Sequence, residues 1–148
     1  MNLEPHPEGG WYRELYRSPL RVGASQGERA AITSIYYLLE AHQVSRWHVV
    51  AADEIWHHYA GAPLELFAYA PRLHQLRRQM LAPAGVSEGP VAVIEAGIWQ
   101  AARSAGEYSL LGCTVAPGFE FADFRFVKSL PQHASHFESV LHGLEDLL

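Results

Sequence analysis

Residues 46–61 read RWHVVAADEIWHHYAG, and this stretch decides the fold because it describes two β-strands joined by a turn at residues 51–53. Side chains alternate between the two faces of a strand. One face of the first strand therefore carries Arg46, His48 and Val50. On the second strand one face carries Glu54, Trp56 and His58, and the other carries Ile55, His57 and Tyr59. Neighbouring antiparallel strands lie about 5 Å apart, so His48 and Glu54 can converge across this pair.

The rest of the chain repeats the same pattern, with short runs rich in Trp, Tyr, Phe, Val and Ile separated by Gly, Pro and Asp. Such runs suit a half-buried pleated surface, and one run in about ten residues favours a sandwich or barrel. The predicted strands are Gly10–Tyr16, Ala31–Leu39, Val44–Val50, Glu54–Ala60, Leu64–Tyr69, Leu73–Met80, Val91–Ile94, Ile98–Arg103, Tyr108–Val115 and Phe121–Val127. The pattern predicts an all-β fold, in a single domain that spans residues 1–148.

The C-terminal stretch has a different period, which predicts a helix. Its apolar residues recur at spacings of three and four, as on a helix with one apolar stripe. These residues are Phe137, Val140, Leu141, Leu144 and Leu148. Ser129 would cap the start, and Pro131 is tolerated in the first turn. We expect this helix to pack outside the barrel, with His133, His136 and His142 in solvent.

Composition restricts the class of function. The 148 residues include 11 Lys and Arg against 16 Asp and Glu, a net charge of −5, so no basic surplus indicates nucleic acid or an anionic membrane as partner. No run without charges reaches the ~20 residues of a membrane span, and the polar start MNLEPHPEGG is not a signal peptide. Cys113 is the single cysteine, which excludes an intrachain disulfide. We therefore expect a cytoplasmic protein whose partner is a small polar metabolite.

Two spaced motifs resemble those of the cupin superfamily. The spacing His48-x-Val50-(x)3-Glu54-(x)6-Gly61 is similar to the first cupin motif, G(x)5HxH(x)3–4E(x)6G, with Val50 in place of the second His. The spacing Gly89-(x)5-Glu95-x-Gly97-(x)2-Gln100-(x)3-Ser104 is similar to the second motif, G(x)5PxG(x)2H(x)3N. It departs from that motif at Glu95, Gln100 and Ser104, which replace Pro, His and Asn.

Four longer segments make the resemblance more specific. They are PHPEGGWYRE at 5–14, DEIWH at 53–57, AGIWQA at 96–101 and GCTVAPGFEF at 112–121. In this order they strongly resemble the Cupin-5 family, over roughly residues 3 to 127. The resemblance implies a cupin double-stranded β-helix, a jelly-roll β-sandwich, with a small-molecule pocket inside the barrel and a homodimeric assembly. Sugar-nucleotide 3,5-epimerases have a similar fold.

The resemblance also raises the question of a metal ion. A cupin site offers three His and one Glu to a divalent ion, and here the matching positions give His48, Glu54 and the amide of Gln100. Strict alternation favours His58 as a further ligand, whereas the family-like segment points to His57, and a bulge after the turn would reconcile the two. One divalent ion (Fe, Mn, Ni or Zn) is therefore one reading. Without an ion, His48 and Glu54 form a pair suited to proton transfer.

Other residues are expected to bind the ligand or to help in catalysis. Arg13 or Arg17 can hold a carboxylate or phosphate through two hydrogen bonds, or can lie on a solvated edge strand. Tyr12, Tyr59 or His57 would serve as a second proton carrier. An aromatic wall would include Trp47, Trp56, Trp99 and Phe119, of which at least two are expected in the core.

These features support three hypotheses about function. The first is an isomerase or epimerase that acts on a polar or sugar-like metabolite, with His48 as base or ligand and Glu54 as its partner. The second is a metal-dependent oxygenase or hydrolase with a degenerate cupin site. The third is a ligand-binding or sensor protein without catalysis.

Overall fold

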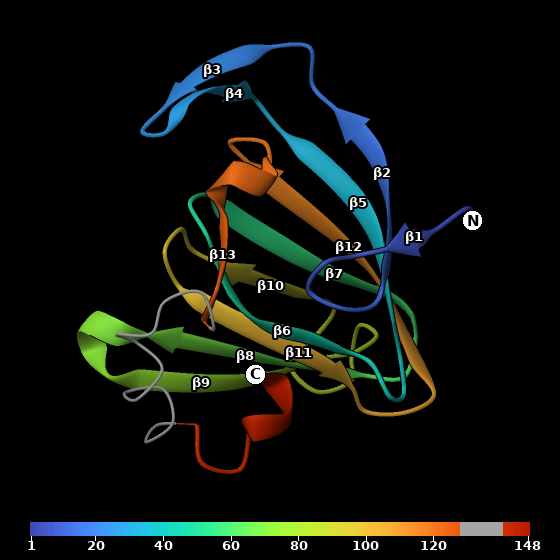
Figure 1. Cartoon of the computed structure of the whole chain (residues 1–148). Coiled ribbons are helices and arrows are strands. Elements are labelled where there is room, and N and C mark those ends of the chain that lie inside the picture. Colours follow the sequence, from blue (N-terminus) through green and yellow to red (C-terminus); the bar gives the residue numbers. More distant parts are fainter. Residues whose placement is uncertain (128–140) are drawn as a thin grey trace.

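The computed structural model describes residues 1–127 and 141–148, and its architecture is two β-sheets packed face to face (Figure 1). The larger sheet has the strand order β1-β2-β5-β12-β7-β10. These strands are β1 (Glu4–Pro5), β2 (Trp11–Arg17), β5 (Thr33–Glu40), β12 (Tyr108–Ala116), β7 (Asp53–Gly61) and β10 (Val91–Ile94). The smaller sheet has the order β13-β6-β11-β8-β9. Its strands are β13 (Phe124–Phe126), β6 (Val44–Val50), β11 (Trp99–Ser104), β8 (Leu64–Ala70) and β9 (Gln75–Leu81). All pairings are antiparallel, so the predicted all-β jelly roll is confirmed.

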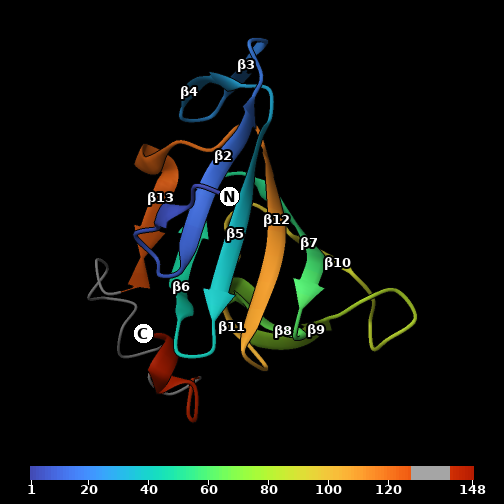
Figure 2. The same cartoon turned by 90° about the vertical axis from the view of Figure 1, so that its right-hand side faces the viewer.

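The predicted strands correspond to observed ones within a few residues, and β6 and β10 have the predicted bounds. The predicted strands Leu73–Met80 and Phe121–Val127 begin later than expected, as β9 and β13. Two short 3-10 helices, η1 (Pro71–Leu73) and η2 (Phe121–Asp123), occupy their first residues. The sequence did not indicate the hairpin of β3 (Arg21–Ala24) and β4 (Gly27–Ala30), which extends beyond the sandwich in both views (Figures 1 and 2). Its polar, glycine-containing sequence, RVGASQGERA, buries little and so lacks the apolar alternation of a core strand.

Two apolar cores stabilise the sandwich. The inner core lies between the sheets and includes Tyr37, Leu39, Trp56, Leu66 and Leu111. The second core covers the outer face of the smaller sheet and includes Trp47, Phe67, Tyr69, Trp99, Leu141 and Leu147. Three of the four tryptophans are thus core residues, as expected for at least two members of the aromatic wall.

The C-terminal residues supply the cover for this second core. Residues 141–148 contain one short 3-10 helix, η4 (Glu145–Leu147), beside β6. His142 is exposed, as expected. The predicted helix from Ser129, with His133 and His136, falls largely on residues 128–140, outside the described residues. No helix within residues 1–127 and 141–148 has the length and apolar character needed to cross a membrane.

The segment of residues 46–61 does not form the expected hairpin. Strand β6 pairs with β11 and β13, and β7 pairs with β12 and β10, so the two strands belong to different sheets. The expectation that His48 and Glu54 meet as ladder neighbours was wrong. The connection at residues 51–52 crosses from one sheet to the other, so the two side chains converge from opposite walls of the sandwich.

Candidate functional site

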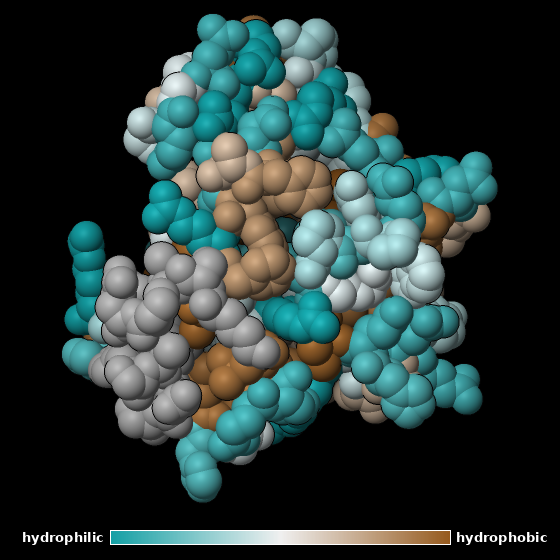
Figure 3. Space-filling model, in the orientation of Figure 1, coloured by the Kyte–Doolittle hydropathy of each residue, from teal (hydrophilic) through white to brown (hydrophobic). Residues whose placement is uncertain are grey.

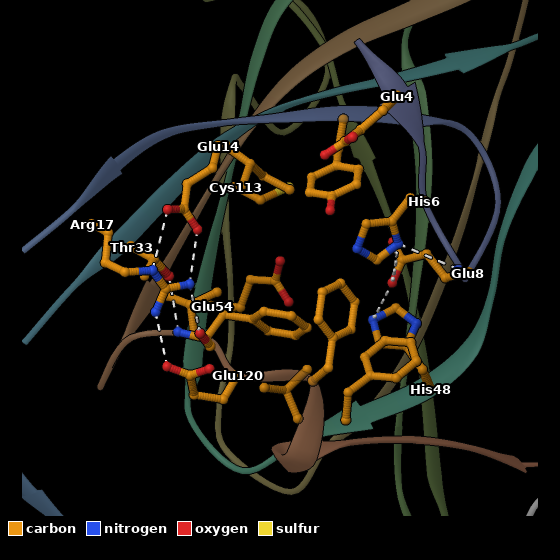
Figure 4. A pocket seen from close by; sticks show the side chains of 17 residues that line it. Glu4, His6, Glu8, Glu14, Arg17, Thr33, His48, Glu54, Cys113 and Glu120 are labelled. Atoms are coloured by element: carbon orange, nitrogen blue, oxygen red, sulfur yellow. Dashed lines mark hydrogen bonds and ion pairs between the residues drawn. The ribbon is translucent and has the colours of Figure 1, made fainter. Parts of the chain in front are cut away.

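A cavity of about 270 Å³ lies between the two sheets and receives side chains from both of them (Figure 4). The smaller sheet contributes His48 from β6, and the larger sheet contributes Glu54 from β7. The loop before β2 and the segment after β12 close the cavity with further polar and aromatic side chains. The cavity is thus the place where chain segments far apart in sequence bring their ionisable groups together.

His48 is held in one orientation by contacts at both ring nitrogens. Its side chain is 2% exposed, and its Nδ1 lies 2.7 Å from the carbonyl oxygen of Arg46. A carbonyl oxygen only accepts hydrogen bonds, so Nδ1 carries a hydrogen. Nε2 lies 3.3 Å from Oε2 of Glu8, and this contact is attractive when a proton lies between the two atoms. Nε2 of His48 and Oε2 of Glu8 therefore form a polar pair at the cavity wall.

Glu8 reaches the cavity because the loop before β2 is fixed by close backbone contacts. Gly9 has φ +115°, and a Cβ there would collide with the carbonyl oxygen of Val44. The Tyr37 hydroxyl donates to the Gly9 carbonyl at 2.7 Å. Ser45 Oγ donates to Oε1 of Glu8 at 2.9 Å, which leaves Oε2 directed at His48. Only glycine tolerates this backbone approach, so the two consecutive glycines at 9 and 10 position the carboxylate.

His6 lies beside this pair. Its Nδ1 accepts the backbone N–H of Glu8 at 3.3 Å and lies 3.7 Å from Oε2 of Glu8. Burial lowers the pKa of His6, and the charge of Glu8 opposes that effect only in part. The ring is therefore neutral near pH 7, with its hydrogen on Nε2. It packs edge-on against Tyr12, with the ring centroids 4.7 Å apart.

Glu54 is the second buried carboxyl group of the cavity, beside Glu8. It is 8% exposed, and Gln100 Nε2 donates to its Oε2 at 2.5 Å. Trp56 Nε1 donates to Oε1 of Gln100 at 2.9 Å, which fixes the amide with its nitrogen toward Glu54. Burial raises the pKa of Glu54 from 4.5 to about 7, although the charge of His48 acts in the opposite direction. Glu54 can therefore both accept and donate a proton near neutral pH. Burial raises the pKa of the neighbouring Cys113 well above its usual value, so that group remains a thiol.

Arg17 occupies the opposite side of the cavity from His48, with Glu54 between them (Figure 4). Its guanidinium donates to both carboxylate oxygens of Glu14, to Oε1 of Glu120 at 3.0 Å and to the carbonyl oxygen of Phe119 at 3.1 Å. The hydrogen bond that Arg17 donates to Glu14 is the main cause that raises the pKa of Arg17. Every guanidinium nitrogen is therefore already bonded within the protein.

Aromatic rings complete the wall. Phe119, Phe121 and Phe124 line the cavity, and Phe124 stacks on the His48 ring with the centroids 4.9 Å apart. Phe121 is also half exposed, and Figure 3 shows an apolar surface over η2 and β13 between hydrophilic regions. The apolar walls with a few fixed polar groups are typical of a small-molecule site.

The comparisons with known proteins agree with this geometry. The family model Cupin_5, described as "Cupin superfamily (DUF985)", matches residues 1–127. The chain belongs to the Cupin_5 family. Among solved structures, a hypothetical protein from Leishmania major is similar with a TM-score of 0.82 and 31% identity, over 95% of this chain and 92% of that one. A protein from Shewanella oneidensis is similar with a TM-score of 0.80 and 33% identity, over 95% and 89% of the two chains.

More distant similarity shows the fold alone. The R92A mutant of Bacillus subtilis oxalate decarboxylase has a TM-score of 0.64 and 10% identity, over 99% of this Cupin_5 chain and 36% of its own. No curated protein sequence matches the chain. The family and the cupin fold are therefore shown, and they agree with the resemblance in the sequence motifs.

Five of the predicted site residues line the cavity of this Cupin_5 protein, namely Tyr12, Arg17, His48, Glu54 and Phe119. Gln100 lies behind Glu54 and bonds to it. The others lie elsewhere. Trp56 and Trp99 belong to the two cores. His57 and Tyr59 stack on each other on the outer side of the larger sheet. Tyr59 also packs against Tyr36, and the guanidinium of Arg13 lies over the Tyr36 ring.

His58 follows the strict alternation of β7, since it is buried on the same side as Glu54 and Trp56. Its Nε2, however, lies 2.9 Å from the carbonyl oxygen of Ala62 at the far end of the strand. The register of β7 against β12 shifts between His58 and Ala60, which pair with Leu111 and Leu110. This irregularity follows His58, so it does not turn His57 inward. His57 and His58 thus both lie apart from the pair of His48 and Glu54.

The side chains that match the cupin ligand positions do not fit a divalent ion in this arrangement. Val50 presents an apolar side chain to the cavity, and both polar atoms of Gln100 already bond to Trp56 and Glu54. Within residues 1–127 and 141–148, no group of three or more His, Cys, Asp or Glu side chains has a geometry that could hold a metal ion. The donors present serve one another as hydrogen-bond partners.

His6 and Glu8 are the site residues that the sequence reasoning missed. They lie some forty residues before His48, in a loop that shows no periodicity. The segment PHPEGG does hold a signal, because two consecutive glycines after an acidic residue often mark a close backbone approach. That signal does not specify which segment the loop approaches.

Proposed function

We propose that this Cupin_5 protein is an isomerase or epimerase that moves a proton within a small polar metabolite bound in the cavity. The observation that carries the proposal is Glu54, a buried carboxyl group with a pKa of about 7 in the same cavity as the pair of His48 and Glu8. Proton transfer at a carbon next to a carbonyl requires a base that can ionise and a donor to the carbonyl oxygen, and we assign these roles to Glu54 and to His48 with a proton on Nε2.

The steps follow from the protonation states. Ionised Glu54 accepts the proton from the substrate carbon, and the His48 Nε2–H donates its hydrogen bond to the carbonyl oxygen, where negative charge develops. The 3.3 Å separation from Glu8 is longer than the 2.7–2.9 Å typical of charge-assisted hydrogen bonds, so this hydrogen is available to a substrate oxygen. Glu54 then returns the proton to the former carbonyl carbon, while His48 gives its proton to the carbonyl oxygen and takes the proton of the neighbouring hydroxyl group. The isomer forms, and both groups recover their first states.

The test is exchange of a carbon-bound hydrogen with solvent. The protein is incubated in D₂O with panels of aldoses, ketoses, hydroxy acids and amino acids, and mass spectrometry detects deuterium in each compound. We expect exchange in one compound class, a loss of about 10²-fold or more with Glu54→Gln, and a similar loss with His48→Gln.

Matched variants separate chemistry from general damage. Glu28→Gln and His42→Gln change the same residue types at exposed positions outside the cavity, so they are expected to leave exchange unchanged. A compound that binds without exchange in the wild-type protein would contradict the proposal and favour a binding or sensor protein.

A further inference from the structure

The charge of the cavity identifies a class of ligand. Five carboxyl groups line it, those of Glu4, Glu8, Glu14, Glu54 and Glu120. Among the described residues that line the cavity, Arg17 is the one side chain with a permanent positive charge. The cavity is therefore acidic in spite of the guanidinium.

Arg17 does not offer its charge to a ligand. Its Nε, Nη1 and Nη2 already donate to Glu14, Glu120 and the Phe119 carbonyl group. Four of the five N–H donors of the guanidinium are thus used, so a carboxylate or phosphate ligand would compete with the carboxylates of the protein and remain close to them. Such an exchange gains no charge pair and adds like-charge repulsion.

His6 supplies a group directed at a ligand. Its side chain is 6% exposed, its Nδ1 accepts the Glu8 N–H, and its Nε2–H has no hydrogen-bond partner among the described residues. Figure 4 shows the ring at the cavity wall next to Glu8. This nitrogen is not fully buried and is open to the cavity, so a ligand oxygen can accept a hydrogen bond from it.

The aromatic rings suit a positive charge. Phe119, Phe121 and Phe124 present π systems to the same space as the carboxylates, and a cation over such a ring is attracted by its quadrupole. The volume of about 270 Å³ lies close to the lower end of the roughly 300–1,000 Å³ of ligand pockets, so the space suits a small molecule.

We propose that the cavity selects a small organic cation with an oxygen acceptor, such as an amino or quaternary ammonium alcohol, over neutral and anionic molecules of the same shape. This inference rests on the proposed function only in so far as the ligand is also the substrate, because selection by charge needs no turnover. The carboxylates and aromatic rings hold the cationic nitrogen, and the His6 Nε2–H donates to the oxygen.

The test uses three probes of one shape and three charges, measured by isothermal titration calorimetry. Choline is the cation, 3,3-dimethyl-1-butanol the neutral isostere and 3,3-dimethylbutanoate the anion. We expect choline to bind at least about tenfold more tightly than the alcohol, and the anion to bind more weakly than both. Equal affinity for choline and the alcohol, tightest binding of the anion, or no binding of choline each overturns the inference.

A double variant tests the role assigned to Arg17. Glu14→Gln with Glu120→Gln removes two negative charges and two partners of the guanidinium, so choline should bind about tenfold more weakly and 3,3-dimethylbutanoate more tightly. Glu28→Gln, on β4 and outside the cavity, is the charge control and should change neither affinity. A folded double variant, judged by circular dichroism, with the wild-type order and affinities overturns the inference.

The two proposals fail separately. If the choline series follows the expected order while no compound exchanges hydrogen in D₂O, the ligand class stands and the proton transfer fails. If an anionic or neutral sugar exchanges while choline does not bind, the proton transfer stands and the ligand class fails.

Discussion

Replacement of Glu54 by glutamine should change how the stability of the protein depends on pH. The Glu54 carboxyl group has an ordinary pKa of 4.5 and a pKa of about 7 in the folded protein. The folded state then keeps the proton over a range in which the unfolded chain releases it. This raised pKa stabilises the folded state fully below about pH 4.5, and that stabilisation is lost as the pH rises through about 7.

The size of the effect follows from the same two values. The difference of about 2.5 between them, at about 1.36 kcal/mol for each pH unit, corresponds to about 3 kcal/mol in the free energy of unfolding. Glutamine has the same shape, does not ionise, and its amide oxygen still accepts from Gln100. The stability of Glu54→Gln relative to the wild-type protein should therefore rise by up to about 3 kcal/mol as the pH increases from about 4.5 to about 8.

Urea unfolding of both proteins across this range measures the relative stability directly. Glu28→Gln, an exposed carboxyl group on β4, is the control and should show no comparable rise. A stability difference between Glu54→Gln and wild type that stays within about 0.5 kcal/mol from pH 5 to pH 8 would refute the reasoning, because Glu54 would then ionise alike in both states.

Three further predictions concern residues other than His48 and Glu54. Gly9→Ala places a Cβ against the Val44 carbonyl oxygen at a positive φ. The free energy of unfolding, measured in urea, should therefore fall by about 3 kcal/mol. A change near zero would contradict the close contact that fixes this loop. Asp123→Ala removes both 2.7 Å hydrogen bonds that Arg29 donates to Asp123. Amide hydrogen exchange in the hairpin of β3 and β4 should therefore accelerate, while the amides of β5 stay protected. Exchange in this hairpin at the wild-type rate would contradict the role of Asp123 as its anchor. We propose that the expected homodimer buries the outer side of the larger sheet, where Val93 is 53% exposed. Light scattering should then show a dimer for the wild-type protein and a monomer for Val93→Arg. A monomeric wild-type protein, or a variant that remains a dimer, would contradict this proposal.

The fold was largely predictable because each strand carries its own local signal. The run VSRWHVV at residues 44–50 and the apolar run VAVI at 91–94, which follows Gly89 and Pro90, indicated the bounds of β6 and β10, because short runs of β-forming residues between turn residues mark strands. Polar segments without such runs gave no comparable signal. The hairpin of β3 and β4 was missed for this reason, because a strand that projects into solvent needs no apolar face.

The pair of His48 and Glu54 was also predictable, from motif spacing, but its geometry was not. The sequence shows that the two residues lie six positions apart around a turn. It does not show that the chain changes sheets within that turn, because the pairing of β6 with β11 and of β7 with β12 depends on strands far away in sequence.

By itself the sequence determined the all-β class, the family, and the residues His48 and Glu54 on inward-facing positions. Only the tertiary structure decided that Glu8 and His6 join them and that the Arg17 guanidinium is held by Glu14 and Glu120. The reason is physical. Strand periodicity is a property of neighbouring residues, whereas the pKa of a buried carboxyl group and the net charge of a cavity depend on which distant segments close around it.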